Sequence, residues 1–241
     1  MNRIITISRE FGSGGRELGK RLAEALHIPC YDHEIIEMIA KENGFNEDYV
    51  AHMSEKSIEA AYPLTIGHRF GVPPFQIIDQ PIRVAVAQRQ ILENFAKSGD
   101  CVIVGRGADV ILEAYKPLNI FVYADKESKI ERCQRRAPAG ENMTVSEIEK
   151  RMKQIDRNRA QHHQMYSDSK WGAKESYDLC VNTTRRYVKD LVPAIAKFCE
   201  DWFNSHESDR SETARSISFG RFLLVHIIGQ YGNTTGKGVM V

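Results

Sequence analysis

The sequence predicts an α/β protein in which helices flank a parallel sheet. Three observations lead to this prediction. Short apolar or β-branched segments alternate with longer segments of helical periodicity, which is typical of doubly wound sheets. Residues 101–104 are apolar throughout, as expected for a parallel strand that is covered on both faces. A glycine-rich turn separates the first expected strand from the first expected helix.

Each expected element has a local signal. The expected strands are residues 4–7, 28–31, 101–104, 120–123 and 179–181. Helices are expected from residue 16, from residue 32, from the proline at 81 up to the strand at 101, from 126 to 136, after a capping hydroxyl at 144 or 146, and over 188–202. Pro193 lies inside the last of these, so a kink or a later start is expected there.

Composition and charge limit the partners and the compartment. Lysine and arginine (33) nearly balance aspartate and glutamate (32), and a net charge of +1 gives no general field for nucleic acid or membrane. The five cysteines lack metal-binding spacing and indicate buried thiols in a reducing compartment. No apolar run suits a signal peptide or a membrane span, so we expect a cytoplasmic protein. The oligomeric state is left open.

The chain divides into a core and a tail. Residues 1–203 carry the alternating pattern and form the expected core domain. Within it, residues 44–79 lack one sustained period, so short helices and loops are expected there as an insert that binds an acceptor. Residues 204–241 turn polar and form a tail of unknown order.

The turn after the first strand has the composition of a phosphate-binding loop. It reads Gly12, Ser13, Gly14 and Gly15, and the helix begins near Arg16. Small residues let backbone N–H groups approach phosphate oxygens, and the helix N-terminus adds a positive dipole. A plain strand-to-helix turn rich in glycine is the alternative.

Several segments, in the same order along the chain, resemble the cytidylate kinase-like family over roughly residues 2–203. They are ITISREFGSGG, CYDHEII, VIVGRGAD, NIFVYA, RMKQIDRNRAQHH and YDLCVNTT. The resemblance implies a P-loop NTPase fold with an acceptor-binding insert and a helical lid over residues 137–165. It also implies ATP and Mg²⁺ as cofactors, and transfer of the γ-phosphoryl group to a nucleoside monophosphate, with CMP or dCMP the first candidate.

The glycine loop departs from a standard Walker sequence, which ends in lysine and a hydroxyl residue. Gly15 occupies the lysine position, so Arg16 is the candidate substitute cation and Glu17 a possible metal ligand. This departure keeps two alternatives open. One is a P-loop kinase for another small metabolite, and the other is a nucleotide-binding regulatory protein with little turnover. The segment 232–237 imitates a Walker loop, but it has one residue too few and no helix follows it.

The resemblance also implies roles for residues outside the loop. Asp32, Arg106 and Asp109 are candidates for substrate binding, with helix capping or a surface position as alternatives. Arg157 and Arg159 are expected in the lid as catalytic cations, with a solvated basic face as the alternative. The adjacent histidines at 162 and 163 do not suggest a metal site, because neighbouring helical residues point about 100° apart.

Overall fold

A five-stranded parallel sheet forms the centre of the protein. The computed structural model describes residues 2–32, 34–44, 74–137 and 143–207. The strands are β1 (Ile4–Arg9), β2 (Cys30–Tyr31), β3 (Cys101–Val104), β4 (Leu118–Tyr123) and β5 (Leu179–Asn182). Their order is β2-β3-β1-β4-β5, and every pairing is parallel. The expected parallel sheet and all five expected strands are therefore confirmed.

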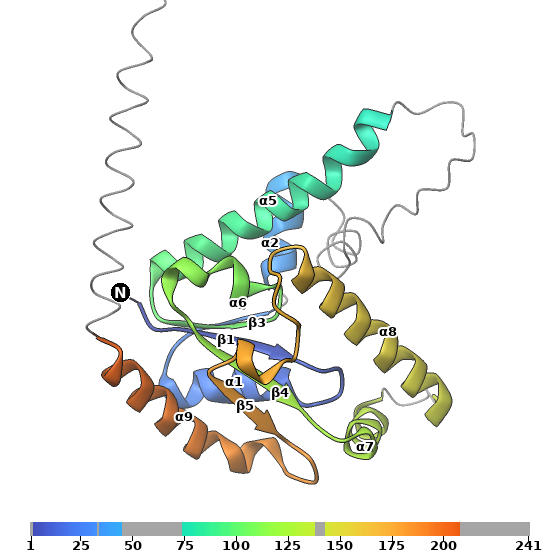
Figure 1. Cartoon of the computed structure of the whole chain (residues 1–241), viewed down its shortest axis with the longest axis vertical. Coiled ribbons are helices and arrows are strands. Elements are labelled where there is room, and N and C mark those ends of the chain that lie inside the picture. Colours follow the sequence, from blue (N-terminus) through green and yellow to red (C-terminus); the bar gives the residue numbers. More distant parts are fainter. Residues whose placement is uncertain (1, 33, 45–73, 138–142, 208–241) are drawn as a thin grey trace, which may run out of the picture.

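Helices cover both faces of this sheet (Figure 1). They are α1 (Gly15–Leu26), α2 (Glu34–Asn43), α5 (Pro74–Ser98), α6 (Ala108–Ile111), α7 (Lys126–Arg136), α8 (Val145–Gln164) and α9 (Val188–Ser205). Short 3₁₀ turns lie at Glu113–Tyr115 and Lys174–Ser176. Helices α2, α5 and α6 pack on one face, and α1 and α9 pack on the other.

Alternate strand residues supply the two cores. Cys101 and Ile103 of β3 join the core beneath α5, while Val102 and Val104 join the core beneath α1 and α9. All four are at most 1% exposed. Burial of each such aliphatic side chain contributes about 1.5 to 3 kcal/mol, which explains why this segment is apolar throughout.

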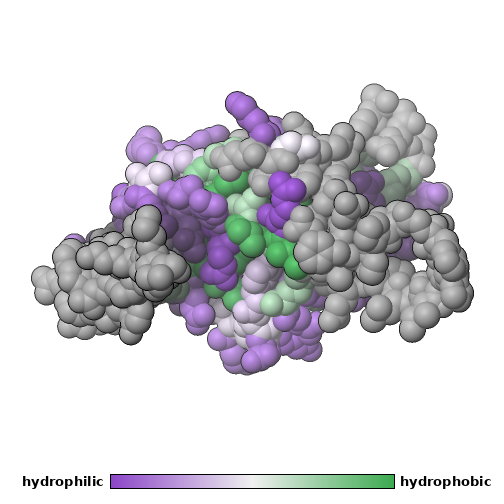
Figure 2. Space-filling view, turned by 90° about the horizontal axis from the view of Figure 1, so that it is seen from above, coloured by the Kyte–Doolittle hydropathy of each residue, from purple (hydrophilic) through white to green (hydrophobic). Residues whose placement is uncertain are grey.

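The outer face of α5 retains some apolar surface. Ile82 and Val86 are 47% and 58% exposed on this helix. Seen from above in Figure 2, a patch of apolar residues lies near the centre of the molecule, next to hydrophilic residues. No helix among the described residues is long and apolar enough to cross a membrane.

The strand order positions the functional loops. β1 and β3 are neighbours, but the helix after β1 covers one face of the sheet and the helix after β3 covers the other. The loops that follow these two strands therefore diverge and leave a crevice, which is where open α/β sheets bind ligands. Helices α7 and α8 lie on the side of the sheet where the strands have their carboxyl ends (Figure 1).

Helix boundaries differ from the expected ones at two prolines. Helix α5 begins at Pro74 and runs through Pro81, so residues 74–79 are helix and the expected start at 81 is wrong. Proline at a first helical position is favoured, and Pro74 is that residue. Helix α9 begins at Val188 and contains Pro193, so the later start is also wrong. Residues 45–73, the tail from 208 and the segment 232–237 lie outside the described residues.

Candidate active site

The glycine loop connects β1 to α1 in a conformation that only glycine adopts readily. Gly12 and Gly14 have φ of 76° and 85°, and Gly14 caps α1. A Cβ atom at Gly14 would lie 2.8 Å from Cγ2 of Val188. The loop therefore presents backbone at the helix N-terminus, where N–H groups and the helix dipole favour an anion.

Buried side chains hold this loop from behind. Arg132 of α7 donates to the carbonyl of Gly12 at 2.6 Å and to that of Thr183 at 3.2 Å. The hydroxyl of Thr183 donates to the carbonyl of Ser13 at 2.6 Å. Two loop carbonyls that would repel a phosphate are thus occupied by protein donors. Burial lowers the pKa of Arg132, and the nearby Arg136 and Arg135 lower it further.

A cleft of about 730 Å³ opens between the glycine loop and the helices α7 and α8. Pockets for small molecules commonly have volumes of about 300 to 1,000 Å³. The acidic side chain in its lining is Glu10, which pairs with Lys129 at 2.8 Å. Six arginines line it, namely Arg9, Arg16, Arg132, Arg136, Arg151 and Arg159. Apolar side chains complete the wall, namely Phe11, Met143, Ile148 and Ile155. We call this space the donor cleft.

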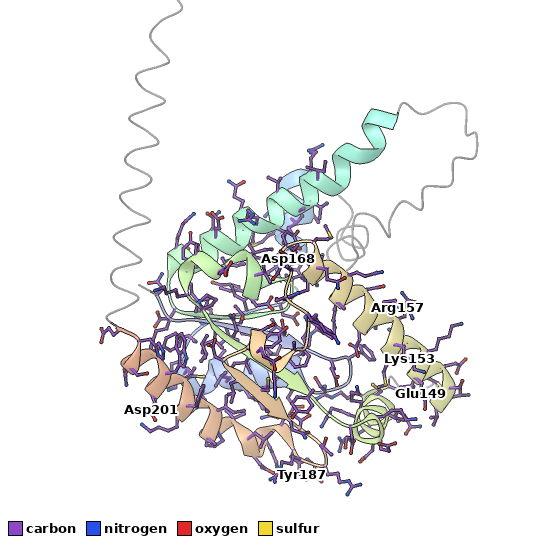
Figure 3. All side chains as sticks on the ribbon, in the orientation of Figure 1. Glu149, Lys153, Arg157, Asp168, Tyr187 and Asp201 are labelled. Atoms are coloured by element: carbon purple, nitrogen blue, oxygen red, sulfur yellow. The ribbon has the colours of Figure 1, made fainter. Side chains whose placement is uncertain are left out.

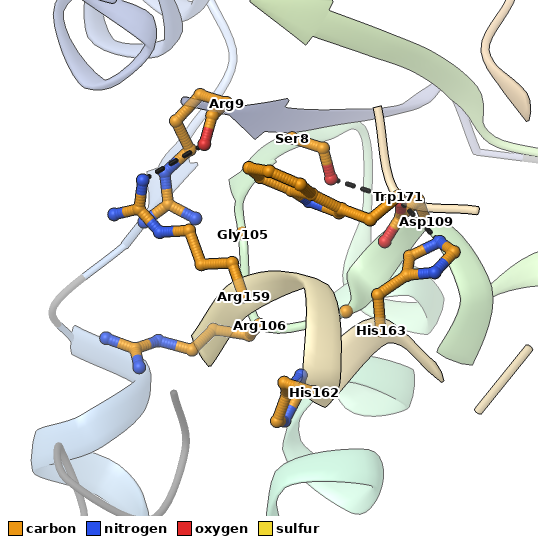
Figure 4. Close-up of a pocket in the computed structure, with 10 residues that line it drawn as sticks. Ser8, Arg9, Gly105, Arg106, Asp109, Arg159, His162, His163 and Trp171 are labelled. Atoms are coloured by element: carbon orange, nitrogen blue, oxygen red, sulfur yellow. Dashed lines mark hydrogen bonds and ion pairs between the residues drawn. The ribbon is translucent and has the colours of Figure 1, made fainter. Parts of the chain in front are cut away.

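A smaller pocket of about 30 Å³ lies next to it, in the crevice between the ends of β1 and β3 (Figure 4). Its lining is polar and aromatic, namely Ser8, Arg9, Gly105, Arg106, Gly107, Asp109, Arg159, His162, His163 and Trp171. We call it the strand-end pocket. Among the described residues, Arg9 and Arg159 alone line both spaces.

The structure brings two predicted substrate-binding residues, Arg106 and Asp109, into the strand-end pocket. Arg106 follows β3 with φ of 60° and is 8% exposed, and its carbonyl accepts from Nε2 of Gln88 at 2.9 Å. Asp109 Oδ2 accepts from Ser8 Oγ at 3.0 Å and lies 3.6 Å from His163 Nε2. This placement agrees with a substrate role for both residues, which stays a prediction.

The other predicted residues at the loop pair with one another. Arg16 binds the buried carboxylate of Asp32 through its Nε, although its own side chain is 58% exposed. Glu17 binds Arg136 and also Arg21, the latter at 2.9 Å. Asp32 and Glu17 line neither of the two spaces. Their roles in binding acceptor and metal remain predictions. Arg16 lines the donor cleft while its guanidinium forms an ion pair with Asp32.

The two lid arginines lie on different sides of α8. Arg159 Nη1 donates to the carbonyl of Arg9 at 3.0 Å and faces both spaces. Arg157 is exposed and lies with Lys153 on the outer side of the helix (Figure 3). His162 and His163, in the last turn of α8, are buried, and His163 faces Asp109. Among the described residues, no cluster of His, Cys, Asp or Glu is placed to hold a metal.

Asp156 connects α8 to the approach of the glycine loop. Its Oδ1 accepts from the backbone N–H of Phe11 at 2.7 Å and lies 3.7 Å from Arg159 Nη1. Burial raises the pKa of Asp156 from 3.8 to about 6, against the opposing effects of this hydrogen bond and of Arg159. The lid helix is thus hydrogen-bonded to the approach of the loop through a carboxylate whose pKa is raised to about 6.

Sequence reasoning missed Arg9, Arg132 and Trp171 as site residues. Arg9 is the last residue of β1, directly before the glycine loop, and that position is the signal that could have found it. Arg132 belongs to the basic stretch of α7, and nothing in its composition distinguishes the buried arginine from exposed Arg135. Trp171 follows α8 in irregular backbone, where sequence periodicity carries no information.

This fold and this loop define the class of P-loop proteins with a kinase-like arrangement. The family model described as the cytidylate kinase-like family matches residues 4–185. The chain therefore belongs to the cytidylate kinase-like family. A search of curated proteins found no significant match.

The chain is similar to several solved structures. An uncharacterized protein from Eubacterium ventriosum ATCC 27560 is 26% identical with a TM-score of 0.58, covering 82% of this chain and 98% of that one. A shikimate kinase from Bacteroides thetaiotaomicron is 16% identical with a TM-score of 0.49, covering 83% and 99% of the two chains. A gluconokinase from Sinorhizobium meliloti 1021 is 16% identical with a TM-score of 0.45, covering 85% and 97%.

Proposed function

We propose that this protein transfers the γ-phosphoryl group of ATP to a nucleoside monophosphate, with CMP or dCMP as the first acceptor to test. One observation carries the proposal most directly. A large arginine-lined cleft above the glycine loop meets a second arginine-lined pocket at Arg9 and Arg159. Phosphoryl transfer requires donor and acceptor phosphates to meet among cations, because negative charge must be stabilised while it is transferred.

The donor side fits a nucleoside triphosphate. Gly12 and Gly14 hold the loop backbone in left-handed conformations before α1, and the cleft above them has the volume and the positive lining for a triphosphate with its nucleoside. Phe11 and Ile148 provide apolar surface for a base. We assign Gly12, Ser13, Gly14, Gly15 and the start of α1 to the phosphates.

The acceptor side is assigned to the strand-end pocket. Arg106 presents a planar guanidinium fork, which suits a monophosphate. Asp109, fixed by Ser8, offers an oxygen to a hydroxyl or an amino group. Arg159 faces the meeting point of both spaces, so it is placed to act on the group in transit.

Magnesium would supply charge neutralisation of the phosphates, and it binds oxygen ligands while keeping several waters. Protein oxygens near the phosphate loop come from Glu10, which lines the donor cleft, and from Glu17 on α1. Glu17 is the ligand predicted from the sequence. Its carboxylate is held by Arg21 and Arg136, so Glu17 would have to exchange one of these partners for the metal.

Two observations favour specific alternatives. The strand-end pocket measures about 30 Å³, which has room for one small polar group of an acceptor but not for a nucleobase, and its polar lining would suit such a group on another metabolite equally well. Gly15 stands where a Walker loop has lysine, which favours a regulatory protein that binds ATP without efficient turnover. These alternatives differ from the proposal in the acceptor and in turnover, respectively.

An acceptor screen with two readouts tests the proposal against both alternatives. ADP release is measured with ATP and Mg²⁺ plus each nucleoside monophosphate, and in parallel plus small hydroxy acids and sugars. Binding is followed by the fluorescence of Trp171, in a Trp202→Phe background that removes the other tryptophan, which lies on α9.

The pattern of the two readouts separates the three functions. ADP release that depends on CMP, together with a Trp171 signal that saturates with CMP, supports the proposal. Release with a hydroxy acid or a sugar alone would assign the other metabolite class. ATP binding without ADP release under any condition would make the protein a binding protein.

A further inference from the structure

The side chain of Arg9 fills the places that two glycines leave empty. A Cβ atom at Gly15 would lie 2.5 Å from Cβ of Arg9 and 2.9 Å from its Cγ. A Cβ atom at Gly105, in the loop after β3, would lie 2.6 Å from Cζ of Arg9 and 3.0 Å from its Nη2. The stem of Arg9 therefore passes over Gly15, and its guanidinium rests on Gly105.

This path explains why position 15 carries no side chain. Real Cβ atoms do not approach other carbon atoms at 2.5 Å, so a lysine at position 15 would collide with Arg9 at its first side-chain atom. A lysine at position 15 and a side chain at position 9 thus exclude each other. The chain has placed a cation at the end of the strand in place of the one in the loop.

We propose that Arg9 is the catalytic residue that takes over the work of the missing lysine, by binding the terminal phosphates of ATP and the phosphoryl group in transit. This inference rests on the proposed function. Arg9 lines both the donor cleft and the strand-end pocket, as a residue between donor and acceptor must. Arg159 Nη1 donates to the backbone carbonyl of Arg9 at 3.0 Å, so Arg159 is fixed to the strand end that carries Arg9 (Figure 4).

Arg16, Arg132 and Arg136 line the donor cleft but not the strand-end pocket. Arg16 binds Asp32 and is 58% exposed. Arg132 is tied to the carbonyls of Gly12 and Thr183, and Arg136 binds Glu17. Arg9 lies at the point where the loops of β1 and β3 diverge, and its planar fork can contact two phosphate oxygens in a fixed geometry.

The transfer step needs no proton exchange on Arg9. An oxygen of the acceptor forms a bond to the γ-phosphorus, and the bond from that phosphorus to the bridging oxygen breaks. The electron pair leaves on ADP, while Arg9 stabilises the charge on the oxygens that move. A single lost contact of this kind slows transfer by about 10²- to 10³-fold.

Moving the cation between the two positions tests this assignment. Arg9→Gly should lower kcat by about 10²-fold or more, and Gly15→Lys alone should also lower it, because the new side chain meets Arg9. The double variant with Arg9→Gly and Gly15→Lys opens the space and restores a lysine, so it should recover at least about tenfold over Arg9→Gly. Arg9→Gln, which keeps the length and removes the charge, replaces Arg9→Gly if the glycine variant does not fold. Arg3→Ala is the matched control, because Arg3 adjoins the opposite end of β1 and pairs with Asp100 on the surface.

Calorimetric binding of ATP, ADP and AMP separates failure of this inference from failure of the proposed function. If no acceptor is phosphorylated, the proposed function fails. The role of Arg9 is then tested only by the affinities of the Arg9→Gln variant for ATP and AMP. Arg9→Gln should then weaken ATP by at least about tenfold while leaving AMP within about twofold. Equal ATP affinity in Arg9→Gln and wild type would overturn the assignment. A wild-type kcat in Arg9→Gln would also overturn it. The same holds if Arg16→Ala loses activity while the Arg9 variants keep theirs.

Discussion

Gly14 is the residue at which backbone conformation and packing both demand glycine. Its φ is 85°, and an added Cβ would lie 2.8 Å from Val188 of α9. Gly14→Ala should therefore lower the free energy of unfolding by roughly 1 to 3 kcal/mol and weaken ATP binding. Gly99→Ala is the matched control, because no atom lies within 4 Å of its added Cβ. Urea unfolding checks both variants, and equal stability of the two would contradict the described loop conformation.

Asp156 predicts a pH dependence of stability. Its pKa is raised from 3.8 to about 6, so the folded protein binds more protons than the unfolded chain between these values. The contribution of this group to stability is complete below about pH 4 and is lost as pH rises through about 6. Asp156→Asn keeps an oxygen acceptor for Phe11 and removes the titration. From pH 4 to pH 7 the wild type should lose roughly 2 to 3 kcal/mol relative to this variant, and a constant difference would refute the burial of this carboxylate.

At this scale the sequence indicated the glycines of the loop and several candidate arginines, and it missed two arginines that contact residues far away in the chain. Gly12 and Gly14 could be named because a phosphate loop has a local composition. Arg132 could not be named, since its role depends on Thr183, about fifty residues away in the chain. Arg9 could be noticed from its position before the loop, but its contact with Gly105, about a hundred residues away, is visible only in the fold. Arg16 was named from its position after the glycines, but its pairing with Asp32 becomes visible only in the fold.

Helix α7 supports the glycine loop through one side chain. Arg132 is 5% exposed and binds the carbonyls of Gly12 and Thr183. Arg132→Ala leaves both carbonyls without this donor, so it should lower stability by about 2 to 4 kcal/mol and weaken ATP binding. Arg135→Ala changes an exposed arginine of the same helix and should stay within about 0.5 kcal/mol of wild type. Thermal unfolding with and without ATP compares the two variants. An equal loss of stability in both would contradict the support of the glycine loop by Arg132.

Helix α8 and the loop after β3 should have separable kinetic effects. Arg106→Ala should mainly raise the acceptor KM, because the residue lines the acceptor side alone. Arg159→Ala should lower kcat by about 10²- to 10³-fold, because the residue faces the point of transfer. Arg157→Ala should lower kcat less than Arg159→Ala, since Arg157 lies on the outer side of α8 (Figure 3). Steady-state kinetics decide, and a larger kcat effect at Arg157 than at Arg159 would reverse the assigned order.

Elements were predictable where a signal is local. The five strands could be recognised by their apolar residues, and the start of α8 by the capping box of Thr144 and Glu147, which the structure contains. The start of α5 was misplaced, because two prolines compete for the first helical position and the sequence offers no reason to choose between Pro74 and Pro81. Helix α6, which has four residues, is too short to show a period.

At the scale of the whole molecule, the order of the strands creates the site. β1 pairs with β3 on one side and with β4 on the other, so the loops after β1 and β3 meet at the crevice where their helices separate to opposite faces. The strand-end pocket lies in that crevice and the donor cleft lies next to it, and Arg9 and Arg159 line both of them. The alternation of strands and helices predicts a parallel sheet, but strand order is a long-range property that such a pattern does not contain.

Transfer of labelled phosphate tests the central claim most directly. The purified chain is incubated with Mg²⁺, CMP and ATP labelled in its γ-phosphate, and the products are separated. Phosphoryl transfer between the two spaces predicts label in CDP, formed at the rate of ADP release and lost in Arg159→Ala. Label that remains in ATP, in a protein shown by calorimetry to bind both nucleotides, would contradict phosphoryl transfer to CMP.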